Sequence, residues 1–166
     1  GVIGSYSDLS IEQYKELARE LGREIARRGA VLVGGVEKGA GLVREAAKGA
    51  KEEGGLVLSI PRKKVDLCEE VDVWVPTYGA IGLREYVLPL ACDVIIAING
   101  GSGTLNEISV AYQNNIPVIM LKSGGWSERL AGTFLDERRK YKFEVASTPR
   151  EAVNKALQII NKGGSL

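Results

Sequence analysis

The chain has 166 residues, with 22 basic and 21 acidic side chains, so its formal net charge is +1. A chain of this length is expected to form one domain, because domains commonly run to about 100–200 residues. The near balance of charge argues against a protein whose main partner is the phosphate backbone of a nucleic acid, so no nucleic-acid partner is expected. Histidine is absent, which excludes within this chain a Ser-His-Asp triad, a Cys-His dyad, a His-Glu-x-x-His zinc site and a His-ligated haem.

The remaining composition limits which side chains can transfer protons and which cellular compartment is expected. General acid–base catalysis must use Glu, Asp, Lys, Tyr or Cys. The two cysteines, Cys68 and Cys92, form no Cys-x-x-Cys pair, so a reduced, cytoplasmic protein is expected. The apolar run at residues 94–98 is far shorter than the roughly 18–20 residues that cross a bilayer, so no membrane partner is expected.

Short apolar runs alternate along the chain with longer amphipathic segments. The short runs predict strands at residues 1–4, 31–33, 56–60, 72–75, 93–98, 117–121 and 142–146. Apolar residues at helical spacing predict helices at residues 11–28, 41–53, 82–91, 105–114 and 149–161. Ser10 is the expected N-cap of the first helix, and loops are expected at residues 99–104 and 122–126.

This alternation indicates βαβ units and a parallel sheet. Several strand runs are apolar on both faces, as a sheet covered by helices on both sides requires. We therefore expect an α/β fold, a Rossmann-like three-layer sandwich of about seven mostly parallel strands with helices on both faces. A single domain is expected over residues 1–162, followed by a frayed tail at 163–166.

Glycine and serine follow several of the predicted strands. In a parallel α/β sheet, ligands bind beyond the carboxyl ends of the strands, so these turns should meet at one rim. Glycine allows backbone to approach a ligand closely there, which accounts for the 21 glycines of the chain. The rim residues predicted to bind a phosphate or another part of a ligand are Gly4, Ser5, Gly34, Gly35, Gly100, Gly101, Ser102, Gly103 and Thr104.

The segment Asn-Gly-Gly-Ser-Gly-Thr-Leu-Asn-Glu at residues 99–107 is the most informative motif. It follows an apolar strand and opens a helix, where free N–H groups, the positive helix end and two hydroxyl groups favour a phosphate. The alternative is a tight strand-to-helix turn, but three glycines in residues 100–103 exceed what such a turn needs. Neither Gly-x-Gly-x-x-Gly nor the P-loop pattern occurs, which argues against a dinucleotide cofactor and against a P-loop NTPase.

Three further residues have two interpretations each. Thr104 and Glu107 fit a capping box, yet Glu107 would also place an ionised carboxylate beside the phosphate loop, suited to act as a base or to stabilise a cation. Arg84 could hold a phosphate or a base edge, or it could be an exposed helix residue paired with Glu85. Trp126 could form a wall of the pocket or cover the core.

The paired glycines at Gly34-Gly35, the segment Gly39-Ala-Gly41-Leu42, Arg84 and the motif ending at Glu107 resemble one known group. It is the superfamily labelled "possible lysine decarboxylase", which includes the LOG cytokinin-activating phosphoribohydrolases and the molybdenum cofactor carrier proteins. The resemblance implies a Rossmann-like fold and a homo-oligomer, a dimer or a tetramer. It also implies a 5′-phosphate site at residues 100–104, with Glu107 and Arg84 as catalytic residues for N-glycosidic cleavage.

Two departures from the hydrolase pattern leave the function open. Asn99 stands where hydrolase members have Pro, and Glu85 follows Arg84 where they have Lys. One expectation is hydrolysis of the N-glycosidic bond of a nucleoside 5′-monophosphate to base and ribose 5-phosphate. The alternative is a non-enzymatic carrier for molybdenum cofactor or another phosphorylated ligand. No metal site and no required cofactor are expected, and no lysine lies in a setting that would hold pyridoxal phosphate for a decarboxylase.

Overall fold

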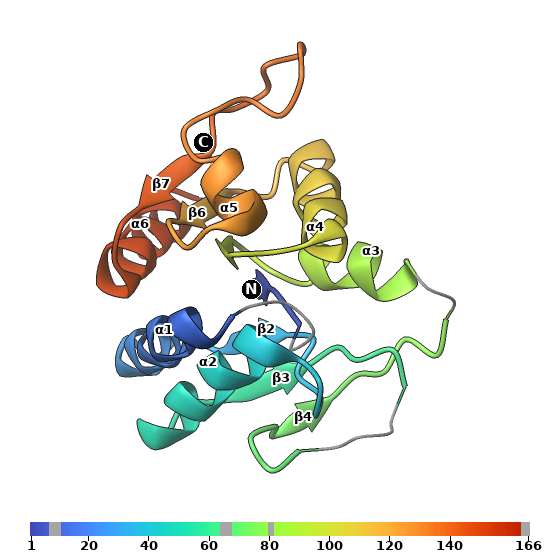
Figure 1. Ribbon diagram of the computed structural model, residues 1–166, viewed down its shortest axis with the longest axis vertical. Coiled ribbons are helices and arrows are strands. Elements are labelled where there is room, and N and C mark those ends of the chain that lie inside the picture. The colour runs from blue at the N-terminus through green and yellow to red at the C-terminus, as the bar shows by residue number, and fades with distance from the viewer. Residues whose placement is uncertain (7–10, 64–67, 80–81, 164–166) are drawn as a thin grey trace.

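The computed structural model describes residues 1–6, 11–63, 68–79 and 82–163 (Figure 1). Its strands are β1 (Val2–Gly4), β2 (Leu32–Gly34), β3 (Val57–Ser59), β4 (Val73–Trp74), β5 (Ile95–Ile98), β6 (Val118–Leu121) and β7 (Glu144–Ala146). Its helices are a short 3-10 turn η1 (Glu12–Tyr14), α1 (Lys15–Arg27), α2 (Gly41–Glu52), α3 (Leu83–Leu90), α4 (Ser102–Gln113), α5 (Gly125–Arg129) and α6 (Pro149–Asn161). None of the helices within these ranges is long and apolar enough to span a membrane.

The strands pair in parallel in two hydrogen-bonded groups. One group has the order β1-β5-β6-β7 and the other has the order β2-β3-β4. The two groups meet where β2 lies against β1, because a Cβ added to Gly34 would stand only 3.2 Å from the carbonyl oxygen of Val2. The chain leaves β1 to build β2, β3 and β4 on one side and then returns to β5 on the other. The expected α/β fold is confirmed, and its topological switch point lies between β1 and β5.

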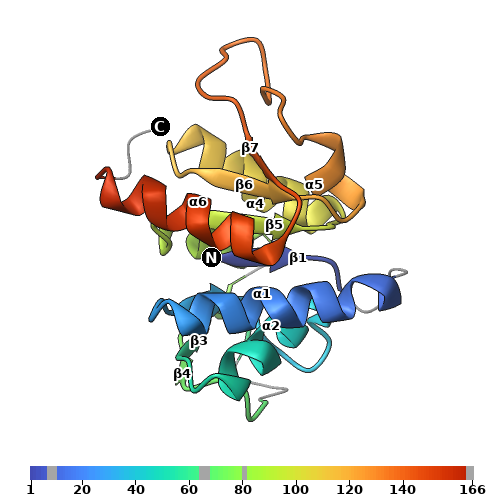
Figure 2. The same cartoon turned by 90° about the vertical axis from the view of Figure 1, so that its left-hand side faces the viewer.

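Successive strand residues point into two separate cores. Val2 of β1 and Ile96 of β5 belong to the core beneath α1, α2 and α6. Their neighbours Ile3 and Ile95 belong to the core beneath α3 and α4. Because side chains alternate across a strand, a sheet covered on both faces needs apolar residues at every position. The two helical layers lie on opposite sides of the sheet (Figures 1 and 2).

Helices α1 and α2 touch backbone to backbone at two glycines. A Cβ added to Gly22 would stand 1.8 Å from the carbonyl oxygen of Ala46, and one added to Gly49 would stand 1.8 Å from that of Arg19. Only glycine permits this approach, so these two residues set how α2 lies against α1.

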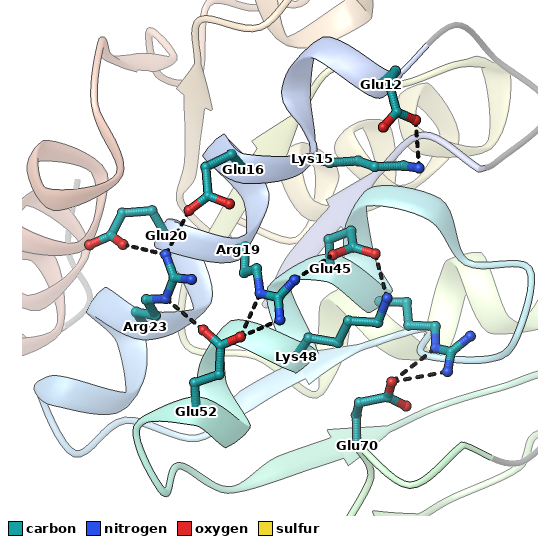
Figure 3. A network of polar contacts seen from close by, with 11 residues as sticks. Glu12, Lys15, Glu16, Arg19, Glu20, Arg23, Glu45, Lys48, Glu52 and Glu70 are labelled. Carbon is teal, nitrogen blue, oxygen red and sulfur yellow. Dashed lines mark hydrogen bonds and ion pairs between the residues drawn. The ribbon is translucent and has the colours of Figure 1, made fainter.

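Charged side chains surround this helix contact (Figure 3). Arg23 of α1 pairs with Glu20 at 2.9 Å and with Glu52 of α2 at 2.7 Å, and Arg19 also pairs with Glu52. These side chains are partly exposed, and exposed ion pairs contribute little to stability, typically about 0–1 kcal/mol each. The two glycines therefore determine how α1 packs against α2, and the ion pairs contribute little to the stability of this contact.

Two local predictions differ from the structure. Helix α4 begins at Ser102 instead of residue 105, because Gly101 with extended backbone already acts as its N-cap. Helix α5 occupies residues where a loop was expected at 122–126. Its first turn is held by tertiary hydrogen bonds, from Trp126 N to Gly100 O at 3.1 Å and from Ser127 N to Asn99 O at 2.9 Å. The predicted N-cap Ser10 and residues 164–166 of the predicted tail lie outside the described residues.

Candidate functional site

A cavity of about 470 Å³ opens where β1, β2 and β3 end and where α3 and α4 begin. This is the switch point of the sheet, where open α/β folds bind their ligands. The structure brings most of the predicted rim residues to its wall. The predicted site residues that line it are Gly4, Ser5, Gly35, Arg84, Gly101, Ser102, Gly103, Thr104 and Glu107.

Three predicted site residues do not line this cavity. Gly34 is the last residue of β2 and packs against Val43. Gly100 lies in the loop between β5 and α4 but is not among the residues that line the cavity. Trp126 lies in α5 and packs against the core beneath α4, with the guanidinium carbon of Arg129 5.1 Å from its ring centre. Of its two interpretations, the structure favours the one in which Trp126 covers the core.

The loop between β5 and α4 owes its shape to two residues with left-handed backbone. Asn99 has φ 57° and Gly100 has φ 111°, and a Cβ on Gly100 would meet Thr104 Cγ2 at 2.5 Å. Proline, whose φ is fixed near −65°, cannot take the conformation of Asn99. The departure from the hydrolase pattern at this position is therefore a requirement of this loop.

Asn99 also ties three strand ends together through its side chain. Its Nδ2 donates to the carbonyl of Ser123 after β6 at 2.6 Å, and its Oδ1 accepts from the Ser5 hydroxyl after β1 at 2.6 Å. The same Ser5 oxygen accepts from the N–H of Gly100 at 2.8 Å. Ser5 is thus engaged in holding the loop in place.

The start of α4 presents unpaired backbone donors to the cavity. The first intrahelical bond runs from Leu105 N to Gly101 O at 3.0 Å. The N–H groups of Ser102, Gly103 and Thr104 therefore have no acceptor within the described part of the chain. A Cβ added to Gly103 would meet no atom of a described residue within 4 Å, so the described part of the chain leaves the space over this turn open. Unpaired N–H groups and the positive end of the helix together attract an anion.

Glu107 is not part of a capping box. The N-cap is Gly101, so Glu107 lies in the second turn of α4, where its side chain lines the cavity with 6 % exposure. No described residue hydrogen-bonds its carboxyl group. Burial raises the pKa of Glu107 to about 8, while the charge of Arg84 lowers it and that of Glu85 raises it further. Burial without a hydrogen bond from a described residue favours the neutral form of Glu107, in contrast to the ionised carboxylate that the sequence predicts.

Arg84, at the start of α3, is buried and held by acidic and phenolic groups. Its Nη1 donates to the Tyr6 hydroxyl at 2.8 Å and lies 3.4 Å from Glu37, and its Nη2 donates to Glu85 at 3.0 Å. The hydroxyl of Tyr6 also donates to Glu37, and burial raises the pKa of Tyr6 to about 12. Arg84 therefore pairs with Glu85, as one interpretation expected, but in a buried position on the cavity wall.

Sequence reasoning missed several residues of this site. Tyr6 and Arg62 line the cavity, and each follows a strand end, so the rule that located the glycines could have found them. Glu37 lies in the loop between β2 and α2, and no spacing in the sequence relates it to Tyr6 or to Arg84.

The comparisons with known proteins agree with the α/β fold described above. The model of the SLOG cluster4 family matches residues 1–153. An uncharacterized protein of Archaeoglobus fulgidus is 36 % identical over 156 residues, which cover 93 % of this chain and 91 % of that protein.

Two solved structures are similar over nearly their full length. The structure of TM1055 superposes with a TM-score of 0.87 at 31 % identity, covering 95 % of this chain and 97 % of that one. The molybdenum cofactor binding protein of Rippkaea orientalis has a TM-score of 0.83 at 30 % identity, covering 96 % and 95 % of the two chains. These matches support the expected LOG-like superfamily, without support for the lysine decarboxylase label. The chain belongs to the SLOG cluster4 family.

Proposed function

We propose that the protein binds a phosphorylated heterocyclic ligand, a nucleotide or molybdenum cofactor, in the cavity at the switch point. The observation that carries this proposal is that two kinds of polar group line the same cavity. They are the N–H groups of residues 102–104 and the buried carboxyl of Glu107, none of which has a hydrogen-bond partner among the described residues. The volume of about 470 Å³ is within the range of small-molecule sites.

The two groups suit different parts of such a ligand. The phosphate lies at the start of α4, as anions do at helix N-termini. The neutral carboxyl of Glu107 offers one O–H donor and one C=O acceptor, which match a ring edge that carries an acceptor, a ring N or C=O, next to an N–H donor. Binding of such an edge would satisfy a polar group that is otherwise buried without a partner.

Binding without turnover is the version that the site favours. The terminal nitrogens of Arg84 are already engaged by Tyr6 and Glu85. Glu107 with a pKa of about 8 is mostly neutral at pH 7, so it supplies little negative charge to stabilise an oxocarbenium ion. The similarity to the Rippkaea molybdenum cofactor binding protein supports a carrier of that cofactor as one form of this proposal.

Hydrolysis of a nucleoside 5′-monophosphate is the second candidate, supported by the position of the Glu107 carboxyl on the same cavity as the phosphate site. A neutral carboxyl could donate its proton to the departing base as the bond between C1′ and the base nitrogen breaks. Water would then add to C1′ and give its proton to the Glu107 carboxylate, which yields ribose 5-phosphate and restores the neutral carboxyl. In this role Glu107 is a general acid, instead of the base that the sequence predicts.

One experiment tests the proposal and separates the two candidates. We would titrate the protein by calorimetry with nucleoside 5′-monophosphates and with molybdenum cofactor, and would follow free base by chromatography. Binding that Gly103→Val abolishes, without release of base, is expected for a carrier. Release of base that Glu107→Gln abolishes would instead establish the hydrolase. Absence of binding by all of these ligands would reject the proposed function.

A further inference from the structure

Arg62 is a cation on the cavity wall with no acidic partner among the residues that the structure describes. It follows Pro61 directly after β3, its side chain is half-buried, and it lines the same cavity as the start of α4. No ion pair or side-chain hydrogen bond joins it to a described residue. Arg84, the other arginine on this wall, is instead neutralised by Glu85 and Glu37. Arg62 therefore brings to the site a positive charge that no described residue neutralises.

The backbone of Arg62 is fixed in place. The carbonyl oxygens of Pro61 and Arg62 accept hydrogen bonds from the N–H groups of Thr77 at 3.1 Å and Tyr78 at 3.0 Å. These bonds continue the pairing of β3 with β4 beyond the strand ends. Pro61 is buried, which holds the segment from the core side. The guanidinium group is thus attached to a rigid part of the rim.

Arg62 and the phosphate site extend into the cavity from different strand ends of the rim. Helix α4 follows β5, and β3 is separated from β5 by β2 and β1. Strands lie about 4.8 Å apart, so three spacings separate the ends of β3 and β5 by about 14 Å. The two positive groups therefore start from well-separated strand ends, which favours two anionic groups on the ligand over a single phosphate. A diphosphate bound at α4 would also place both of its charges near the helix end.

We infer that the ligand carries two separated anionic groups: a phosphate bound at the start of α4, and an acidic group at the far end of its ring system that pairs with Arg62. This inference rests on the proposed function, because it takes the phosphate site at α4 as given. It narrows the ligand class to bis-anionic heterocycles, and it makes Arg62 the residue that distinguishes them from simple monophosphates.

A matched pair of probes tests this directly. AMP and N6-succinyl-AMP share the same phosphate, ribose and adenine, and only the second carries carboxylates at the far end of the base. We expect the wild-type protein to bind N6-succinyl-AMP about tenfold more tightly than AMP, because a hydrogen-bonded pair between charged groups adds about that factor. Arg62→Gln should remove this preference, because it should lower the affinity for N6-succinyl-AMP much more than the affinity for AMP.

The control is Lys63→Gln, which removes the neighbouring exposed positive charge and should preserve the preference. Equal wild-type affinity for the two probes would overturn the inference, and so would an equal loss for both probes in Arg62→Gln. In either case AMP binding that still depends on Gly103 would leave the proposed function standing. If neither probe binds, the inference fails together with the nucleotide form of the proposed function.

Discussion

At Glu107 a carboxyl group is buried beside one arginine and one glutamate, with no hydrogen bond from a described residue. The arginine charge opposes the shift in pKa, yet it is already shared with Glu85 and Glu37, so desolvation prevails. The cost of this arrangement depends on pH, because an unfolded chain ionises Glu107 at its ordinary pKa of 4.5. Burial of Glu107 therefore lowers the free energy of unfolding as the pH rises.

The sign of this effect can be measured with Glu107→Gln. Between pH 4.5 and about 8 the unfolded state loses the proton and the folded state keeps it, so the free energy of unfolding of the wild-type protein should fall through this window. Glutamine does not titrate, so the variant should gain stability relative to wild type on going from pH 4.5 to pH 8. Urea unfolding at both pH values would check this. A relative stability that is the same at the two values would mean that Glu107 is ionised in the folded protein.

Gly103 allows the phosphate site to be blocked without disturbing the fold. An added Cβ at this position meets no atom within 4 Å in the part of the chain that the structure describes, so Gly103→Val should place its methyl groups in the space over the start of α4. We expect the melting temperature to change little and the affinity for any monophosphate that binds to fall at least tenfold. Calorimetry would measure the affinity, and circular dichroism would confirm the fold. Unchanged affinity in a folded variant would place the phosphate elsewhere.

At the scale of the elements, the contact between α1 and α2 depends on having no side chain at Gly49. A Cβ there would stand 1.8 Å from the carbonyl oxygen of Arg19, which only a displacement of the helix can relieve. Gly49→Ala should therefore destabilise the protein by about 1–3 kcal/mol or more. Gly103→Ala is the matched control, because it is also a helical glycine but has free space, and it should be neutral or stabilising by up to about 1 kcal/mol. Equal effects of the two substitutions in urea unfolding would contradict this assignment.

The helices and strands that the sequence predicts well are those whose apolar positions recur regularly and whose ends carry local signals. Helix α6 matches its prediction at both ends, because Pro149 at its first residue and Thr148 as its cap are local signals. Helix α5 was missed because its first turn is held by carbonyl groups of residues 99 and 100, far away in the chain. The start of α4 was misplaced because Gly101 caps it without a side chain.

The site residues also divide into those that local sequence signals locate and those that only the folded chain brings together. Most of the rim glycines, Arg84 and Glu107 were found because the ends of buried strands can be located from the sequence, whereas Gly34 and Gly100 were predicted but do not line the cavity. The protonation state of Glu107 could not be predicted, since it depends on burial by α3 as well as on its own helix. The bond between Tyr6 and Glu37 could not be predicted either, because it joins two loops that only the folded sheet brings together.

At the scale of the molecule, the homo-oligomer implied by the family resemblance stays a prediction with a defined test. Leu83, Tyr86 and Leu90 of α3 share one helix face and are 42 %, 52 % and 43 % exposed. A second copy of the chain covering this face would bury them, as oligomers bury apolar surface. Tyr86→Glu should then shift the protein toward the monomer in sedimentation velocity.

Phe134→Glu serves as the control, because Phe134 is 38 % exposed and lies in the segment between α5 and β7 that projects from the body in both views (Figures 1 and 2). This variant should sediment like wild type. A wild-type protein that is monomeric at every concentration would refute the oligomer. The cytoplasmic location and the absence of a nucleic-acid partner stay predictions as well.

The separation of the strands into two ladders affects how the molecule unfolds. No ladder of hydrogen bonds joins β1 to β2 in the described residues, so the two halves of the sheet are coupled mainly by side chains and loops. The cavity spans this junction, with Gly35 and Arg62 from one half and Ser102–Thr104 from the other. A ligand bound there contacts both halves, and its binding energy adds to their coupling. Hydrogen exchange should therefore slow in β2 and β3 as well as in β5 when the site is occupied, so that two partly independent folding units become one cooperative unit.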